Sequence, residues 1–312
     1  MDVRARVVGW SALGMFCVVG AGRPDTSRSP WGGYSYPASY DAEIADPDVH
    51  RVLYEDGEIM FLEVANPPGL DVRMHGHPYP SVFARDAGAG QNTAGVAMKD
   101  VLLDEKGPFN GEGWGQGPPP SGLQFPRCTT SPPQGPHKPI NKSDVPVHFY
   151  RIEFRRLDGD EIATRWKDWY PWMREPSRPV KNVAQMDSIA AAPDNYHLLY
   201  EDGHVRLLEV GIRPGETTPR HAHPYPAVLA FNAATPTSDA GEGAGRAPPP
   251  AVLDMKFPLC LTSAPQGAHV IHNGGSAPLH YYRIEFKRVD GEGYRTNWRK
   301  WYPWMQYMQH MR

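Results

Sequence analysis

The sequence is poor in cysteine, in long apolar runs and in charge of one sign. Among 312 residues there are 3 cysteines, and 32 basic residues stand against 35 acidic ones, for a net charge of -3. Without a basic stripe or a block of like charge, the chain is not expected to bind nucleic acid. Its longest apolar run, Val7 to Val19, is too short to cross a membrane by itself.

That apolar run follows Arg4 and Arg6 and ends in small residues at positions 20–22. This order is typical of a secretory signal peptide. We therefore expect residues 1–22 to be removed, and the mature protein to be secreted or periplasmic, with no stable membrane insertion. The alternative is a non-native upstream extension or a disordered terminus on a cytoplasmic protein.

Glycine and proline, by contrast, are abundant (31 and 34 residues), and the sequence repeats itself once. His75 in HGHPYPSV corresponds to His221 in HAHPYPAV, 146 positions later, and His148 in HFYRIEF corresponds to His280 in HYYRIEF, 132 positions later. A repeat this long is one folded domain per copy rather than a solenoid unit. We expect an N-terminal arm at 23–45 and domains at 46–175 and 176–312.

Within each copy, short apolar runs alternate with turn residues, which is typical of an all-β fold. Asp56-Gly57 lies between two such runs and predicts a hairpin, as does Asp202-Gly203 in the second copy. In the last strand of the first copy, residues 148, 150, 152 and 154 share one face and the charged residues 151, 153 and 155 share the other. We expect the apolar face to point into the barrel.

Two pairs of histidines have the spacing of metal ligands. In an extended segment His75 and His77 project from the same face, as do His221 and His223, so each pair can share an ion. A third ligand is expected from the histidine that lies just after each Pro-Gln-Gly turn, two residues beyond its glycine. The predicted metal ligands are His75, His77, His137, His221, His223 and His269.

These motifs resemble those of the cupin superfamily. The chain has PPGLDVRMHGHPYPSV and PQGPHKPIN in the first copy, and RPGETTPRHAHPYPAV and PQGAHVIHN in the second. The resemblance implies two tandem jelly-roll β-barrels, a bicupin, with a divalent metal ion in each barrel and about two ions per chain. The glutamate of the first cupin motif is missing, since Val82 and Val228 stand where it is expected.

A site of three histidines without a carboxylate is similar to those of thiol dioxygenases such as cysteine dioxygenase, of gentisate-type ring-cleaving dioxygenases and of diketone-cleaving enzymes. This resemblance implies an Fe(II) dioxygenase acting on a small organic substrate, with zinc, manganese, nickel or copper as alternative metals. Two other functions remain open. One is a lyase, isomerase or hydrolase that uses the metal only as a Lewis acid, and the other is a non-enzymatic module that binds a metal or small ligand.

Four further residues are candidates for a catalytic role. Tyr79 and Tyr225, each between two prolines, are either acid/base groups at the mouth of the site or rim aromatics. His148 and His280, on the face expected to point inward, are either ligands, substrate-facing bases or hydrogen-bond partners of a ligand, or else ordinary core residues.

Two remaining features concern packing. The segments WKDWYPWM (166–173) and WRKWYPWM (298–305) are rich in aromatic residues, so we expect them to close a barrel end or to join domains or subunits in a homo-oligomer. An aromatic lid over the substrate is the alternative.

Cys128 and Cys260 occupy equivalent positions, which usually lie far apart in neighbouring domains. We therefore expect no disulfide between them but two small buried hydrophobic residues, or else a reactive thiol.

Overall fold

The computed structural model describes residues 26–28, 35–87, 92–97, 126–175, 186–233, 238–240 and 258–308. The predicted signal peptide at 1–22 lies outside these described residues. Among the helices of the described ranges, none has the length and apolar character needed to cross a membrane.

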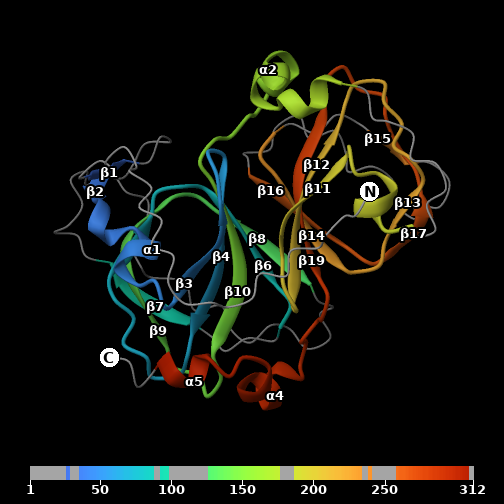
Figure 1. Cartoon of the computed structure of the whole chain (residues 1–312). Coiled ribbons are helices and arrows are strands. Elements are labelled where there is room, and N and C mark those ends of the chain that lie inside the picture. Colours follow the sequence, from blue (N-terminus) through green and yellow to red (C-terminus); the bar gives the residue numbers. More distant parts are fainter. Residues whose placement is uncertain are drawn as a thin grey trace, which may run out of the picture.

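The first half of the chain forms two antiparallel sheets that face each other (Figure 1). The larger sheet has the strand order β3-β4-β10-β6-β8, and the smaller has the order β5-β9-β7. The strands are β3 (His50–Glu55), β4 (Ile59–Asn66), β5 (His75–His77), β6 (Ser81–Arg85), β7 (Asn92–Ala97), β8 (Arg127–Ser131), β9 (Gln134–Asn141) and β10 (Val147–Phe154).

The second half repeats this arrangement, with a five-stranded sheet of order β11-β12-β19-β14-β16 and the pairs β13-β17 and β15-β18. Its strands are β11 (Tyr196–Glu201), β12 (Val205–Ile212), β13 (His221–His223), β14 (Ala227–Phe231), β15 (Ser238–Ala240), β16 (Leu259–Ser263), β17 (Gln266–His269), β18 (Ile271–Asn273) and β19 (Leu279–Phe286). The expected all-β fold of two tandem jelly-roll barrels is confirmed.

Short elements precede each barrel. Strands β1 (Thr26–Arg28) and β2 (Ser35–Pro37) pair with each other, followed by η1 (Ala38–Tyr40) and α1 (Ala42–Ala45) before the first barrel. Helix α3 (Ser188–Ala191) lies before the second barrel. It begins at Asp187, whose side chain accepts a hydrogen bond from the backbone N–H of Ile189 and so satisfies one of the helix's free donors.

The two five-stranded sheets pack against each other through apolar side chains. Tyr150 of β10 contacts Phe286 of β19 with ring centroids 5.9 Å apart, and Phe154 contacts Tyr282 at 6.0 Å. Because Tyr150 is equivalent to Tyr282 and Phe154 to Phe286, the two contacts are the same contact made twice. The barrels are therefore related by an approximate twofold axis at their interface.

The expectation that the apolar face of the last strand points into the barrel is wrong. The apolar face of β10, with Tyr150, Ile152 and Phe154, lies in this interface between the barrels. The opposite face points into the first barrel, where Arg151 and Glu153 are almost completely buried, with 2% and 0% exposure. Both faces of the strand are covered, so alternation of apolar and charged residues did not distinguish the barrel interior from its outer face.

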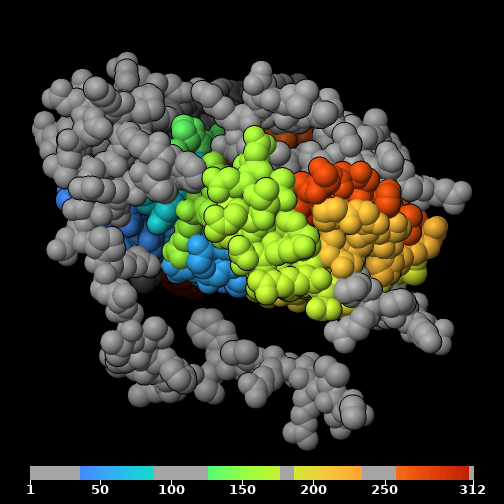
Figure 2. All heavy atoms as spheres, turned by 90° about the horizontal axis from the view of Figure 1, so that it is seen from above, coloured from blue at the N-terminus to red at the C-terminus, as the bar shows by residue number. Residues whose placement is uncertain are grey.

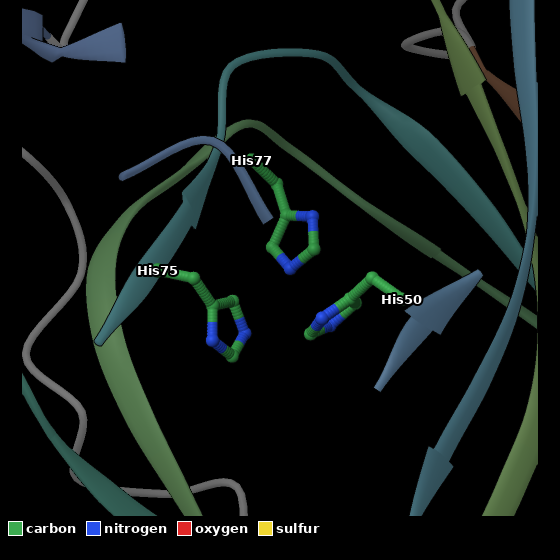
Figure 3. Close-up of side chains that lie close together, drawn as sticks. All are labelled: His50, His75 and His77. Atoms are coloured by element: carbon green, nitrogen blue, oxygen red, sulfur yellow. The ribbon is translucent and has the colours of Figure 1, made fainter. Parts of the chain in front are cut away.

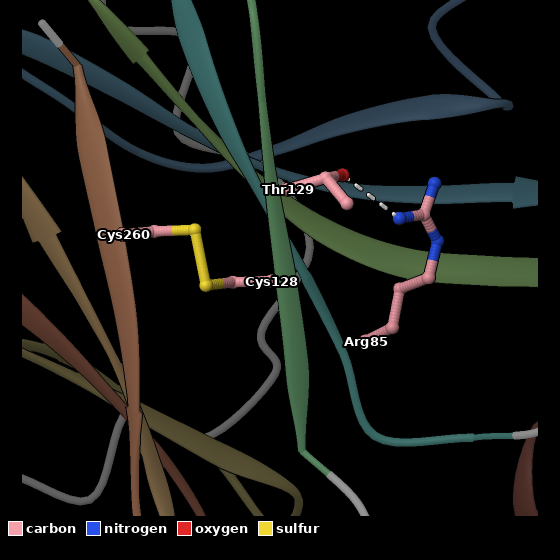
Figure 4. Close-up of a disulfide and its surroundings, with 4 residues drawn as sticks. All are labelled: Arg85, Cys128, Thr129 and Cys260. Atoms are coloured by element: carbon pink, nitrogen blue, oxygen red, sulfur yellow. Dashed lines mark hydrogen bonds between the residues drawn. A yellow bond between two sulfur atoms is a disulfide. The ribbon is translucent and has the colours of Figure 1, made fainter. Parts of the chain in front are cut away.

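The expectation that Cys128 and Cys260 are unpaired is also wrong, because the two cysteines form a disulfide (Figure 4). Cys128 lies on β8 and Cys260 on β16, and their Cα atoms are 6.2 Å apart. Each strand is the last in its five-stranded sheet. Equivalent residues meet when they lie beside a twofold axis, and this is where the two cysteines are placed.

Each aromatic segment packs on the barrel of the other half. After β10, the chain forms α2 (Ile162–Trp169) and η3 (Pro171–Arg174) and crosses to the second barrel. There the ring of Tyr170 lies 3.9 Å from that of His280, and the ring of Trp172 lies 4.1 Å from that of His197. Seen from above, this yellow-green segment lies across both halves of the chain (Figure 2).

The segment at the end of the second copy crosses in the opposite direction. It forms α4 (Tyr294–Trp301) and α5 (Met305–Met308), below the first barrel in Figure 1. Trp298 and Met305 are buried together with Met60 and Leu62 of the first barrel. The two segments therefore pack within one chain, with Tyr170, Trp298 and Tyr302 buried and the other tryptophans half-buried. A homo-oligomer remains a prediction.

Candidate metal centres

In the first barrel the three predicted ligands lie together. His75 and His77 project from β5, and β9 brings His137 opposite His75 in the register of the two strands. The ring centroids of His75 and His77 are 5.2 Å apart, and that of His137 lies 4.6 Å and 5.5 Å from them. Alternation on β5 places its two histidines on one face, and the pairing with β9 supplies the third.

The second barrel reproduces this cluster within 0.1 Å. The corresponding centroid distances among His221, His223 and His269 are 5.1, 4.5 and 5.4 Å. The ligand nitrogens of these three histidines all lie within 4.8 Å of one another, and all three side chains are buried. In the first barrel the histidines that meet the same criterion are His75, His77 and His50, and His137 lies beside them with its ring 4.6 Å from that of His75. Each barrel therefore contains three histidines that could hold a metal ion.

Sequence reasoning missed a fourth histidine in the first barrel. His50, at the start of β3, points toward His75 and His77 (Figure 3). Its ring centroid lies 4.3 Å from that of His75 and 5.3 Å from that of His77. The repeat contained no signal for it, because the equivalent residue of the second copy is Tyr196.

Backbone carbonyl groups orient four of the six triad imidazoles. His75 Nδ1 donates to the carbonyl oxygen of Arg73 at 2.8 Å, and His137 Nδ1 donates to that of Gly135 at 2.9 Å. In the second barrel His221 and His269 make the same bonds, at 2.7 and 2.8 Å. Since Nδ1 carries the proton, the lone pair of each ring is on Nε2, the nitrogen that would bind a metal.

A buried carboxylate orients the remaining ring in each triad. His77 Nδ1 donates to Glu153 Oε1 at 2.7 Å, and His223 Nδ1 donates to Glu285 Oε1 at 3.0 Å. Such carboxylate partners fix the ring and make a metal-binding imidazole more basic. Glu153 and Glu285 were expected on the outer face of the last strand, and their position follows from the reversed faces of β10 and β19.

The donor set fits a divalent cation. Burial, together with the positive charge of nearby groups, keeps the pKa of all six triad histidines below its ordinary value, at about 4 for His137 and His221. Neutral imidazole is the form that binds a metal. In addition, the Nε2 atom of His269 is buried without a hydrogen-bond partner. A metal ion would give that nitrogen the partner it lacks.

The two supporting carboxylates have different electrostatic surroundings. Burial raises the pKa of Glu153 to about 7, although Arg151 opposes this effect. Burial also acts to raise the pKa of Glu285, but hydrogen bonding to His223 and the charges of Arg283 and Arg206 lower it to about 2. Arg206 corresponds to Met60 in the first barrel, which therefore has one cation fewer beside its carboxylate.

The positions of the missing cupin glutamate point away from the histidines. Val82 and Val228 are fully buried, and both belong to the apolar core between the two barrels. A carboxylate there would be buried among apolar side chains of that interface. Valine in place of the motif's glutamate therefore fits the apolar surroundings of this position on β6 and β14.

His148 and His280 do not lie in the histidine clusters. Each lies where its barrel contacts the aromatic segment of the other half of the chain. His148 Nε2 hydrogen-bonds to Glu63 Oε1 at 3.0 Å, and its ring lies 4.4 Å from that of Tyr302. His280 Nε2 bonds to Glu209 Oε1 at 3.0 Å, and its ring lies against Tyr170. The expectation that they face the barrel interior is wrong because their strand face is the outer one.

The two tyrosines flanked by proline are half-buried. Tyr225 lies under the guanidinium group of Arg206, which is 5.0 Å from the centre of its ring. Burial raises the pKa of Tyr79, so this phenol is neutral at ordinary pH. A role for Tyr79 and Tyr225 as acid/base groups remains a prediction.

No family model matches the chain, and no curated protein matches it. Among solved structures it is similar to a cupin domain from Bordetella pertussis Tohama I, with 16% identity over 34% of this chain and 100% of that chain and a TM-score of 0.25.

Two further similar structures cover most of the chain. Salicylate 1,2-dioxygenase from Pseudoaminobacter salicylatoxidans is 10% identical over 74% of this chain and 69% of that chain, with a TM-score of 0.22. AerE from Microcystis aeruginosa is 10% identical over 77% of this chain and 98% of that chain, also with a TM-score of 0.22. At these values the likeness says nothing about activity, so the function proposed below rests on the histidine geometry.

Proposed function

We propose that the protein is a metal-dependent bicupin whose two histidine triads each bind a divalent ion. The observation that supports this most is the arrangement of the second triad. His221, His223 and His269 direct three ligand nitrogens within 4.8 Å of one another in a buried space. Their other ring nitrogens donate to a carbonyl or carboxylate oxygen, so the lone pairs of all three rings are on the converging Nε2 atoms, of which His269 Nε2 has no hydrogen-bond partner.

Within this proposal, we favour an Fe(II)-dependent dioxygenase that acts on a small organic substrate. A bound ferrous ion would supply the redox chemistry with dioxygen and the open coordination positions for substrate. The chain's own groups hold and orient the ligand rings, through the carbonyl of Pro219 and the carboxylate of Glu285 in the second barrel. Burial excludes bulk water from the cluster.

An anaerobic reconstitution with Fe(II), followed by oxygen-uptake measurements on thiols, diketones and phenolic acids, tests this function. Substrate-dependent uptake that is lost in a His221→Ala and His223→Ala double variant is the expected result. If protein purified without chelators contains only zinc and consumes no oxygen, a lyase, isomerase or hydrolase that uses the metal as a Lewis acid becomes the better proposal. A protein that binds no metal would contradict both functions.

We also propose that the protein works in an oxidising compartment, outside the cell or in the periplasm. The signal-like segment at 1–22 supports this, as does the disulfide between Cys128 and Cys260. Fractionation of expressing cells, with mass determination of the mature N-terminus, tests the proposal. Retention of residues 1–22 on a protein found only in the cytoplasm would contradict it.

A further inference from the structure

The two metal centres differ in the residue that completes them. In the first barrel the ligand nitrogens of His50, His75 and His77 all lie within 4.8 Å of one another, and the ring of His137 lies 4.6 Å from that of His75 and 5.5 Å from that of His77. His50 thus adds a fourth imidazole to the three predicted ones. His50 is buried, and its Nδ1 atom is 3.3 Å from the carbonyl oxygen of Asp46. This orientation leaves Nε2 for the ion, as in the other three rings.

In the second barrel Tyr196 occupies the place of His50. Its ring centroid lies 4.7 Å from that of His221 and 5.2 Å from that of His223, close to the 4.3 and 5.3 Å measured for His50. The Tyr196 hydroxyl group donates a hydrogen bond to His221 Nε2 at 2.8 Å. A phenol can donate to or accept from a small ligand at this point, whereas a neutral imidazole bound through Nε2 cannot.

The two centres also differ in their cover. The ring of Tyr36 from β2 lies on Gly76, between the ligands His75 and His77, so closely that a Cβ atom at residue 76 would be 2.7 Å from it. Tyr36 has no exposed surface, and the neighbouring Gln134 is 1% exposed. The first centre is therefore enclosed by the N-terminal arm.

Around the second centre the equivalent residues are more accessible. Ala222, which corresponds to Gly76, is half-buried, and Pro224 is exposed where Pro78 is buried. Gln266 and Gly267 of β17 are half-buried and exposed, whereas their counterparts in β9 are buried. Among the described residues, those around the second centre are thus the more accessible to a small molecule from solvent.

We propose that the first barrel holds its ion with four imidazoles as a closed structural site, whereas the second holds its ion with three and keeps a position open beside Tyr196. Four protein ligands are typical of structural metal sites, and three with an open position are typical of catalytic ones. The ligand of the second centre is a small molecule with an oxygen or nitrogen donor that also hydrogen-bonds to the Tyr196 hydroxyl group. This inference rests on the proposed function, since both sites must bind metal.

Cobalt(II) and azide distinguish the two centres without an activity assay. Apo-protein is titrated with Co(II), and azide is then added while the visible absorption of the ion is recorded. Two double variants isolate the sites: His75→Ala with His77→Ala leaves the second centre, and His221→Ala with His223→Ala leaves the first. We expect azide to change the cobalt spectrum of the former as in the wild type and to leave that of the latter unchanged.

Each other outcome contradicts the inference in a recognisable way. If two cobalt ions bind and both respond to azide, the centres are equivalent and only this inference fails. If the first centre alone responds, the assignment is reversed. If cobalt binds only to the second barrel, the four-imidazole site is wrong. If no cobalt binds, the proposed function fails together with the inference.

Exchange of the two differing residues provides a matched control. Tyr196→His is expected to abolish the azide response of the second centre by supplying the fourth imidazole. Tyr196→Phe removes only the hydroxyl group, so it should keep the azide response. In the first barrel, His50→Tyr should speed loss of cobalt to EDTA at least tenfold. An azide response that persists in Tyr196→His, with two cobalt ions bound, would contradict the proposed difference.

Discussion

Cys128 and Cys260 join the last strands of the two large sheets across the approximate twofold axis, with their Cα atoms 6.2 Å apart. The bond closes a loop of 132 residues and therefore restricts the unfolded chain strongly. The two aromatic segments, which cross from each half of the chain to the other barrel, also hold the two halves together.

The double change Cys128→Ser and Cys260→Ser should therefore lower the free energy of unfolding by about 2–4 kcal/mol. Urea unfolding with and without reductant measures this effect. The wild type should lose the same stability when reduced, and the double variant should be insensitive to reductant. Equal stability of the oxidised and reduced wild type would show that the bond does not form in solution.

A second prediction concerns the carboxylate that orients His77. Glu153→Gln removes the carboxylate that accepts a hydrogen bond from His77 Nδ1 and orients this ring, so the metal affinity of the first barrel should fall by about 10–100-fold. Competition with a chelator of known affinity measures the change. Glu63→Gln is the matched control, because Glu63 accepts from His148 outside the triads and its loss should leave metal affinity unchanged. Equal affinity losses in the two variants would indicate a general effect of destabilisation.

A third prediction concerns the docking of the first aromatic segment. A Cβ atom at Gly211 of β12 would overlap the side chains of Trp172 and Met173. Gly211→Ala should therefore lower the free energy of unfolding by about 1–3 kcal/mol, as expected for overpacking. Denaturant unfolding of the single variants and of the double variant with Trp172→Ala tests the cause. The two effects should be less than additive, because removing the indole relieves the overlap with Trp172 and leaves only that with Met173.

The fourth prediction is a pH dependence of stability. Burial raises the pKa of Asp86 to about 7 despite the opposing effect of His148. Burial alone would lower the pKa of His148, but its hydrogen bond to Glu63 and the charges of Glu63, Asp86 and Asp290 raise it. Both folded-state pKa values are therefore above those of the unfolded chain, so the folded state binds more protons.

Stability from these two groups is fully present below the unfolded pKa of each and is lost as pH rises through its folded pKa. Between about pH 5 and 8 the loss should be at most about 1.4 kcal/mol per pH unit for each proton released. Urea unfolding across this range measures the slope. Asp86→Asn introduces the residue that the second barrel has at Asn232, and it should make the slope shallower. An unchanged slope would show that Asp86 is not the titrating group.

The histidine triads could be predicted from the sequence because their determinants are local. Alternation along an extended strand places His75 beside His77, and the recurrence of the motif in the second copy distinguishes the pattern from chance. The position of His50 could not be predicted in this way. It depends on how the large sheet, which contains β3, faces the small sheet, which contains β5, and the second copy has a tyrosine there.

By itself, the sequence determined two all-β barrels and two sets of three histidines, since period, strand alternation and ligand spacing are properties of short segments. Only the tertiary structure decided which face of β10 points inward, because both faces are buried, one by apolar contacts and the other by paired charges. It also decided that Cys128 meets Cys260 and that each aromatic segment crosses to the other barrel. These contacts arise from the approximate twofold axis between the barrels, and no local pattern encodes the position of that axis.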